Sequence, residues 1–86
     1  MAELNEETGR ELKATDLRPR TIVVIQPPGK TFAITMWVDF VDTERRLVTF
    51  HSEVMHWVVL NSYDEDGVIH DDQGRVVRVY EYLGEP

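Results

Sequence analysis

The sequence contains no cysteine, and this absence excludes disulfide bonds, thiolate metal sites and cysteine nucleophiles. It also lacks any apolar run close to the roughly 18 residues that a membrane-spanning helix needs, so no membrane segment is expected. Residues 1–16 have neither a basic start nor an apolar stretch, which is unlike a secretory signal. We therefore expect a cytoplasmic protein.

The patterns that carry catalysis or phosphate binding are also missing. Neither Ser52 nor Ser62 lies in the glycine context of a nucleophile elbow. Asp71 and Asp72 are adjacent, so on a strand their side chains point to opposite faces and do not form a catalytic pair. Residues 27–30 contain one glycine and lack the spacing of a phosphate-binding loop. The sequence therefore predicts a protein that is not an enzyme and binds no cofactor.

Acidic residues outnumber basic ones, 16 to 9, and the formal net charge is −7. Residues 1–16 carry five acids and two bases, residues 17–60 four acids and five bases, and residues 61–86 seven acids and two bases. A polyanion such as nucleic acid is repelled by both ends of this chain. A protein or peptide partner, for example a basic segment, is therefore the favoured prediction.

From residue 21 onward, apolar and polar residues alternate as they do in β-strands. Residues 21–26 form a continuous β-branched run, which predicts a strand covered on both faces. Residues 31–42 predict a long strand, and a strand of that length favours a bend or bulge. Its expected core face consists of Phe32, Ile34, Met36, Val38 and Phe40.

Further strands are expected at residues 46–51, 55–61, 68–70 and 76–83. Residues 55–61 are apolar on both faces, which is typical of a central strand. Gly29, after two prolines, favours a type II turn, and Gly74 favours a hairpin turn with a bulge. No helix long enough for a parallel crossover is evident, so the fold class is an antiparallel all-β meander. Because closure removes exposed edges, we expect about six strands curled into a small SH3-like barrel.

Residues 1–16 differ from the rest, because they are polar and have no apolar stripe. Thr8 and Glu11 have the spacing of a helix capping box, but Gly9 in the first turn argues against a helix. We therefore expect residues 1–16 to be a flexible acidic tail and residues 17–86 to be a single domain. A tail that becomes ordered when it binds a partner is the alternative.

The residues expected to contact a partner are aromatic. Trp37 lies on the less apolar face of its strand, and Tyr80 and Tyr82 share a face with Arg78. Small barrels bind proline-rich or cationic peptides on aromatic patches of this kind. The competing interpretation is that these rings only complete the core.

Two other functions are compatible with the sequence. A barrel that binds single-stranded nucleic acid would need its basic residues on one surface. Those residues are Arg18, Arg20, Lys30, Arg45 and Arg46. A structural homodimer could instead form through the edge of the long strand at residues 31–42.

The histidines His51, His56 and His70 are the remaining candidates for a metal site. A hairpin could bring His51 close to His56, but their spacing matches no zinc motif. Residues 62–73 have only part of the calcium-loop pattern, because Gln73 stands where a bidentate glutamate is required. We therefore expect no metal and interpret the histidines as strand residues that pack on their neighbours.

Overall fold

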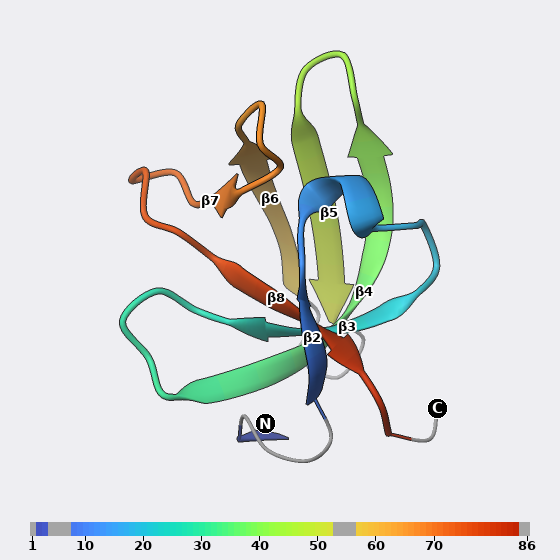
Figure 1. Cartoon of the computed structure of the whole chain (residues 1–86), viewed down its shortest axis with the longest axis vertical. Helices are drawn as coiled ribbons and strands as arrows, with labels where there is room; N and C mark the ends of the chain where they lie inside the picture. Colours follow the sequence, from blue (N-terminus) through green and yellow to red (C-terminus); the bar gives the residue numbers. More distant parts are fainter. Residues whose placement is uncertain (1, 4–7, 53–56, 85–86) are drawn as a thin grey trace.

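The structure is a computed structural model that describes residues 2–3, 8–52 and 57–84 (Figure 1). Apart from one short 3₁₀ turn, the regular elements in these ranges are β-strands. The elements are β1 (Ala2–Glu3), β2 (Thr8–Leu12), η1 (Ala14–Asp16), β3 (Ile22–Gln26), β4 (Phe32–Asp42), β5 (Leu47–Ser52), β6 (Trp57–Tyr63), β7 (Ile69–His70) and β8 (Arg78–Tyr82). All pairs of neighbouring strands are antiparallel, which confirms the predicted all-β class.

The strands pair in the order β2-β8-β3-β4-β5-β6-β7, and β1 pairs with the start of β4. Within the described residues this order does not close, because β2 and β7 are its two ends. The ends do approach each other, since the Ala14 N–H donates to the Gly67 carbonyl at 2.8 Å. A bridge between His70 and Val76 also ties β7 to the chain before β8. The sheet is thus an open antiparallel ladder, and the closed barrel expected from the sequence is not confirmed.

The hairpin of β3 and β4 turns at two prolines, as the sequence predicted. The Lys30 N–H donates to the Pro27 carbonyl at 3.1 Å, which closes a four-residue turn. Gly29 has a φ of 74°, the left-handed conformation that the third position of a type II turn requires. This turn fixes the register in which Ile25 faces Ile34.

β4 contains the bulge that its length predicted. The pairing with β5 shifts register between Val38 and Phe40. An extra residue at this point reverses the alternation of the side chains. Phe40 was expected in the core, but it is 48% exposed, and Val41 packs against the core instead.

The core lies on the inner face of this sheet and draws on nearly every element. Of the expected core face, Ile34, Met36 and Val38 are buried, and Phe32 packs partly against them. The buried core residues are Ala14, Leu17, Val23, Ile25, Ile34, Met36, Val38, Val48, Phe50, Ile69, Val77 and Val79.

The N-terminal segment differs from the expected tail over residues 8–16. Thr8 and Leu12 pair with β8, Ala14 is buried, and Leu12 packs against the core. The glycine that argued against a helix suits the strand, because a Cβ at Gly9 would lie 2.8 Å from the Glu81 Cβ. A single inward leucine on a strand at the end of the sheet is too weak a pattern to detect in the sequence. Residues 4–7 of the expected tail lie outside the described residues.

Two consecutive turns connect β6, β7 and β8 and have the same pattern of backbone hydrogen bonds. In the first, the Asp64 N–H donates to the Val68 carbonyl at 3.0 Å, and the Gly67 N–H donates to the Asp64 carbonyl at 2.9 Å. Gly67 has a φ of 84°. The turn at residues 71–75 repeats these bonds, and Gly74 has a φ of 78°. The glycine bulge predicted at Gly74 is therefore confirmed.

Both turns are held by an aspartate that accepts backbone hydrogen bonds. The Asp64 Oδ1 accepts two backbone N–H groups, and the bond from Val68 is the largest cause that lowers the pKa of Asp64. Loss of hydration raises the pKa of Asp71, but hydrogen bonds from Arg75 and Gln73 outweigh it, so the net direction is also downward. Both carboxylates are therefore more stable as anions in the folded chain than in the unfolded chain.

Acid should weaken the fold through these two turns. Because folding lowers both pKa values, the stabilisation is present above the unfolded value, near 3.9. It is lost as the pH falls through the folded values. We expect the melting temperature of an Asp64→Asn/Asp71→Asn variant to depend less on pH below about 4 than that of the wild type. Asparagine keeps an oxygen acceptor but does not titrate.

Thermal melts between about pH 2 and pH 7 would measure this difference. Gln73→Ala, in the same turn, serves as the control because it removes no titrating group. It should move the whole curve without changing its slope. Equal slopes for the double variant and the wild type would contradict the prediction.

Candidate functional site

Three of the residues expected to contact a partner lie on one face of β4 and β8, with β3 between them. Trp37 pairs with Ile22, and Tyr80 pairs with Val24. Paired residues of neighbouring strands share a face, and alternation along β8 places Tyr82 on the face of Tyr80. We call this surface the aromatic face. It consists of Ile22, Val24, Trp37, Tyr80 and Tyr82.

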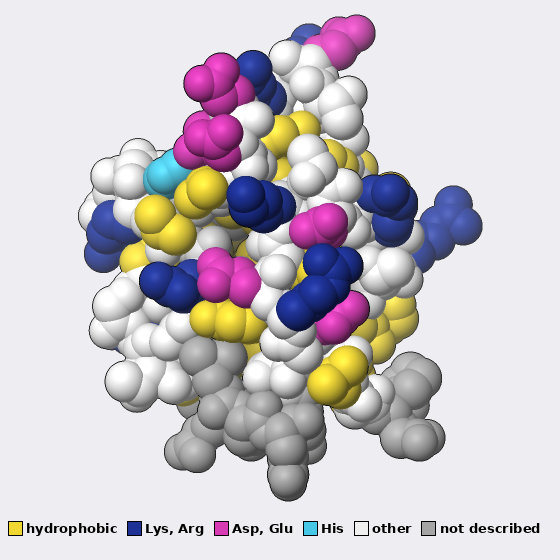
Figure 2. All heavy atoms as spheres, in the orientation of Figure 1, with side chains coloured by type: hydrophobic (Ala, Val, Ile, Leu, Met, Phe, Trp, Pro, Cys, Tyr) yellow, Lys and Arg dark blue, Asp and Glu magenta, His cyan; other side chains and the backbone are white. Residues whose placement is uncertain are grey.

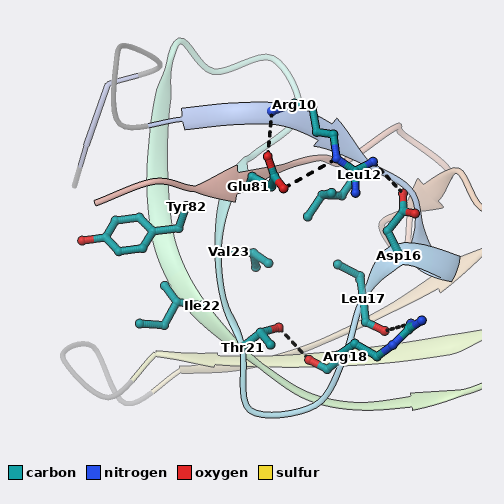
Figure 3. Close-up of a pocket in the computed structure, with 10 residues that line it drawn as sticks. All are labelled: Arg10, Leu12, Asp16, Leu17, Arg18, Thr21, Ile22, Val23, Glu81 and Tyr82. Carbon is teal, nitrogen blue, oxygen red and sulfur yellow. Dashed lines mark hydrogen bonds and ion pairs between the residues drawn. The ribbon is translucent and has the colours of Figure 1, made fainter. Parts of the chain in front are cut away.

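The aromatic face combines packing with exposure. Its three aromatic residues are half-buried, whereas Val24 is only 1% exposed. Figure 3 shows Tyr82 and Ile22 on the side of the sheet that faces away from Val23. Arg78, the fourth predicted residue, is exposed, and its Nη1 lies 3.3 Å from the Glu11 Oε1. The aromatic rings therefore contribute to packing and also present part of their surface to solvent.

A small pocket beside the aromatic face contains paired charges (Figure 3). The Arg10 Nε lies 3.6 Å from the Glu81 Oε2, and the Arg10 Nη1 lies 3.9 Å from the Asp16 Oδ2. The pocket measures about 190 Å³ and is lined by no histidine or serine. This volume is below the roughly 300 Å³ at which small-molecule sites begin. We therefore interpret this pocket as a surface hollow lined by the ion pairs of Arg10 and not as a small-molecule site.

The structure does not gather all five basic residues of the nucleic-acid hypothesis on one surface. Lys30 and Arg45 lie in the turns at opposite ends of β4, and an 11-residue strand measures about 35 Å when straight. The Arg18 Nη1 donates to the Leu17 carbonyl at 3.0 Å. Arg20 and Arg46 both adopt left-handed backbone conformations, with φ of 68° and 54°. Figure 2 shows basic side chains interspersed with acidic ones on the face in view.

The histidines are not brought together in the described part of the chain. His51, on β5, has its Nδ1 2.9 Å from the Asp39 Oδ1. This buried nitrogen makes no hydrogen bond of suitable angle, so the contact is an ion pair only when the ring is protonated. His70 lies on β7, and His56 is outside the described residues. Among the described side chains, no three His, Asp or Glu groups are placed to hold a metal ion.

One edge of β6 has no partner strand over most of its length. β5 pairs with the whole of β6 on one side, whereas β7 pairs only with Ser62 and Tyr63 on the other. Within residues 2–3, 8–52 and 57–84, no strand pairs with residues 57–61 on that second side. This edge lay outside the sequence predictions, which placed the exposed edge on residues 31–42.

The open edge carries unpaired backbone groups. The Tyr63 N–H donates to the Arg46 carbonyl at 2.9 Å, so residue 63 faces the β5 side. Successive residues of an antiparallel strand alternate in this direction, so Val58 and Leu60 direct their N–H and C=O groups toward the open side. We call these backbone groups the β6 edge.

The side chains at the β6 edge are apolar and exposed. Val58 is 70% exposed and Leu60 is 57% exposed. The sequence predicted a central strand at residues 55–61 because both of its faces are apolar. That prediction is wrong at Val58 and Leu60, because no described element covers the outer face there. Residues 53–56 lie outside the described residues.

A groove opens on the inner side of the same strand and measures about 200 Å³. Its apolar lining includes Ile25, Pro28, Ile34, Met36, Val59 and Val77. Asn61 also lines the groove and is only 5% exposed. Among the described residues, the Asn61 side-chain amide has no hydrogen-bond partner. Val59 and Asn61 both belong to β6, so the groove and the β6 edge form one continuous surface.

No protein-family model, curated protein or solved structure matches this chain. In the described ranges, no helix has the length and apolarity needed to cross a membrane. Function is therefore inferred from the β6 edge, the groove and the aromatic face.

Proposed function

We propose that this domain is a non-enzymatic interaction module, an incompletely closed SH3-like barrel that binds an extended segment of a protein partner. The observation that carries the proposal is the unpaired β6 edge beside the groove. A segment lying along this edge completes the hydrogen bonds of Val58 and Leu60 as an added strand. Its side chains then alternate between the groove and the exposed outer face.

The composition of the edge supports a partner. Proteins usually protect exposed edge strands with lysine, proline or inward-pointing charges, and residues 57–61 contain none of these.

The sizes of the cavities also favour a peptide. Three cavities among the described residues measure about 190, 290 and 200 Å³, which suits single side chains better than drug-sized molecules.

The aromatic face is the second surface that can receive a protein partner. Half-exposed aromatic rings beside a charged residue are common features of protein interfaces. Trp37, Tyr80 and Tyr82 provide these rings, and Arg78 provides the charge. A substitution at Tyr80 therefore distinguishes this face from the β6 edge.

Selection from a random peptide library displayed on phage tests the proposal. We expect the selected peptides to bind the wild-type domain and to bind Leu60→Lys at least about ten-fold more weakly, because the new charge must be desolvated when the added strand covers it. Thr43→Lys is the matched control, since Thr43 is an exposed residue of the turn between β4 and β5 and the change of charge is the same. It should bind the peptides as the wild type does.

Affinities are measured by fluorescence polarisation with the selected peptides. Failure to enrich any peptide would overturn the proposed function. Equal binding by Leu60→Lys and the wild type, combined with loss of binding by Tyr80→Ser, would move the site to the aromatic face and overturn the assignment to β6.

A further inference from the structure

We infer that the partner segment places one large uncharged apolar side chain in the groove, and that Asn61 hydrogen-bonds to the segment's main chain beside it. The inference rests on the proposed function, because it concerns what lies along the β6 edge. It assigns the chemistry of the partner and identifies a residue that selects it.

Asn61 is the first part of the argument. Asn61 as a whole residue is only 5% exposed, it lines the groove, and its side-chain amide makes no hydrogen bond within the described chain. The amide atoms are not fully enclosed, so a ligand in the groove can reach them. A side-chain amide offers one acceptor and two donors, which match the N–H and C=O groups of a peptide backbone.

The register of an added strand is the second part. A residue placed opposite Val59 shares its inward face and directs its side chain into the groove. The residues on either side lie opposite Val58 and Leu60 and direct their side chains outward. These outward side chains cover the exposed surface of Val58 and Leu60. One inward anchor between two outward apolar residues therefore fits the surface.

The size and chemistry of the groove define the anchor. A space of about 200 Å³ equals roughly seven water molecules at about 30 Å³ each, which is comparable with one leucine or phenylalanine side chain. Apolar walls disfavour a charged anchor, because its hydration is lost without replacement. The acid in the lining, Asp71, is already engaged, since its Oδ2 lies 2.9 Å from the Arg75 Nε. It is therefore not free to pair with a lysine anchor.

A second copy of this chain fits less well. Pairing through residues 57–61 alone covers well under the roughly 1,200 Å² of a standard interface. Each copy also carries a net charge of −7, so two copies repel each other. A flexible peptide can follow both the edge and the groove, whereas a second β6 is held in its own sheet.

Capped heptapeptides with valine and threonine around a central residue test the inference. The central residue is leucine, phenylalanine, alanine or lysine, and binding is followed by nitrogen–proton NMR of the full chain. We expect the leucine or phenylalanine peptide to bind about ten-fold more tightly than the alanine peptide and to shift the Val58 and Leu60 amides. The side-chain amide signal of Asn61 should shift with them. The lysine peptide should bind most weakly.

Asn61→Leu separates recognition from folding. Replacing an amide that makes no hydrogen bond within the described chain with an apolar side chain of similar volume should preserve the melting temperature. The same change should weaken binding of the leucine peptide about ten-fold. Thr43→Val is the control for replacing a polar by an apolar side chain, because Thr43 lies in the turn between β4 and β5 and does not line the groove. It should leave the affinity unchanged.

The outcomes distinguish this inference from the proposed function. Equal binding of the leucine and lysine peptides, or unchanged affinity in Asn61→Leu, would overturn the inference. The proposed function, binding of a segment as an added strand on β6, would remain. If no peptide of the series shifts the β6 amides, both fail. Shifts of Val58 and Leu60 that depend on protein concentration without peptide would make a second copy the occupant and overturn the inference.

Discussion

Phe50→Ala should cost about 3–5 kcal/mol of unfolding free energy, which is enough to unfold much of a domain this small. Phe50 is 0% exposed and pairs with Val38 on one side and Val59 on the other. Removing its ring leaves a cavity in the centre of the sheet that neighbouring strands cannot fill without breaking their register. Guanidinium titration followed by tryptophan fluorescence measures the change.

Phe40→Ala is the matched control for this experiment. It removes the same ring from the adjacent strand, on the other side of the bulge, where Phe40 is 48% exposed. We expect a loss of about 1 kcal/mol or less. Similar losses for Phe40→Ala and Phe50→Ala would mean that the bulge does not reverse the alternation of β4.

Deleting residues 1–16 should remove most of the stability of the domain. The deletion removes Leu12 from the core and uncovers Val79, which is 0% exposed beside β2. At about 1.5–3 kcal/mol for each buried aliphatic side chain, the expected loss is about 3–6 kcal/mol. The dispersion of amide NMR signals shows directly whether residues 17–86 still fold.

Deleting residues 1–3 is the control for this truncation. Among the described residues it removes only β1, whose two pairs with β4 are Ala2–Ala33 and Glu3–Phe32. We expect a change of about 1 kcal/mol or less. A fragment of residues 17–86 as stable as the full chain would instead support a tail that is separate from the domain.

The strands of the hairpins were predictable because their signals are local. Alternation along residues 31–42 identified β4, and the length of that run identified its bulge. Gly29 and Gly74 marked turns, since only glycine adopts a positive φ there without strain. These features depend on residues within one strand or one turn, so they can be read from a single sequence.

The location of the bulge was not predictable in the same way. The extra residue lies between Val38 and Phe40, because the part of β4 before it and the part after it pair with β5 in different registers. The alternation of apolar and polar residues within β4 does not show how β4 pairs with β5. As a result, Phe40 was assigned to the core when it belongs to the outer face.

The candidate site was predicted in part. The alternation of Arg78, Tyr80 and Tyr82 placed them on one face, and the register of β3 brings Trp37 to that face as well. The β6 edge and Asn61 were missed. The apolar character of both faces of residues 55–61 was the available signal, and it was interpreted as a central strand.

The sequence by itself determined the class of this protein, because hydrophobic periodicity, turn residues and the absence of long helical patterns all act over a few residues. Tertiary structure alone decided which strand edges meet. Strand pairing joins segments far apart in the chain, as β2 and β8 do, and depends on the entropy of closing the chain between them. For that reason an apolar strand has an open edge, and Asn61 lines a groove.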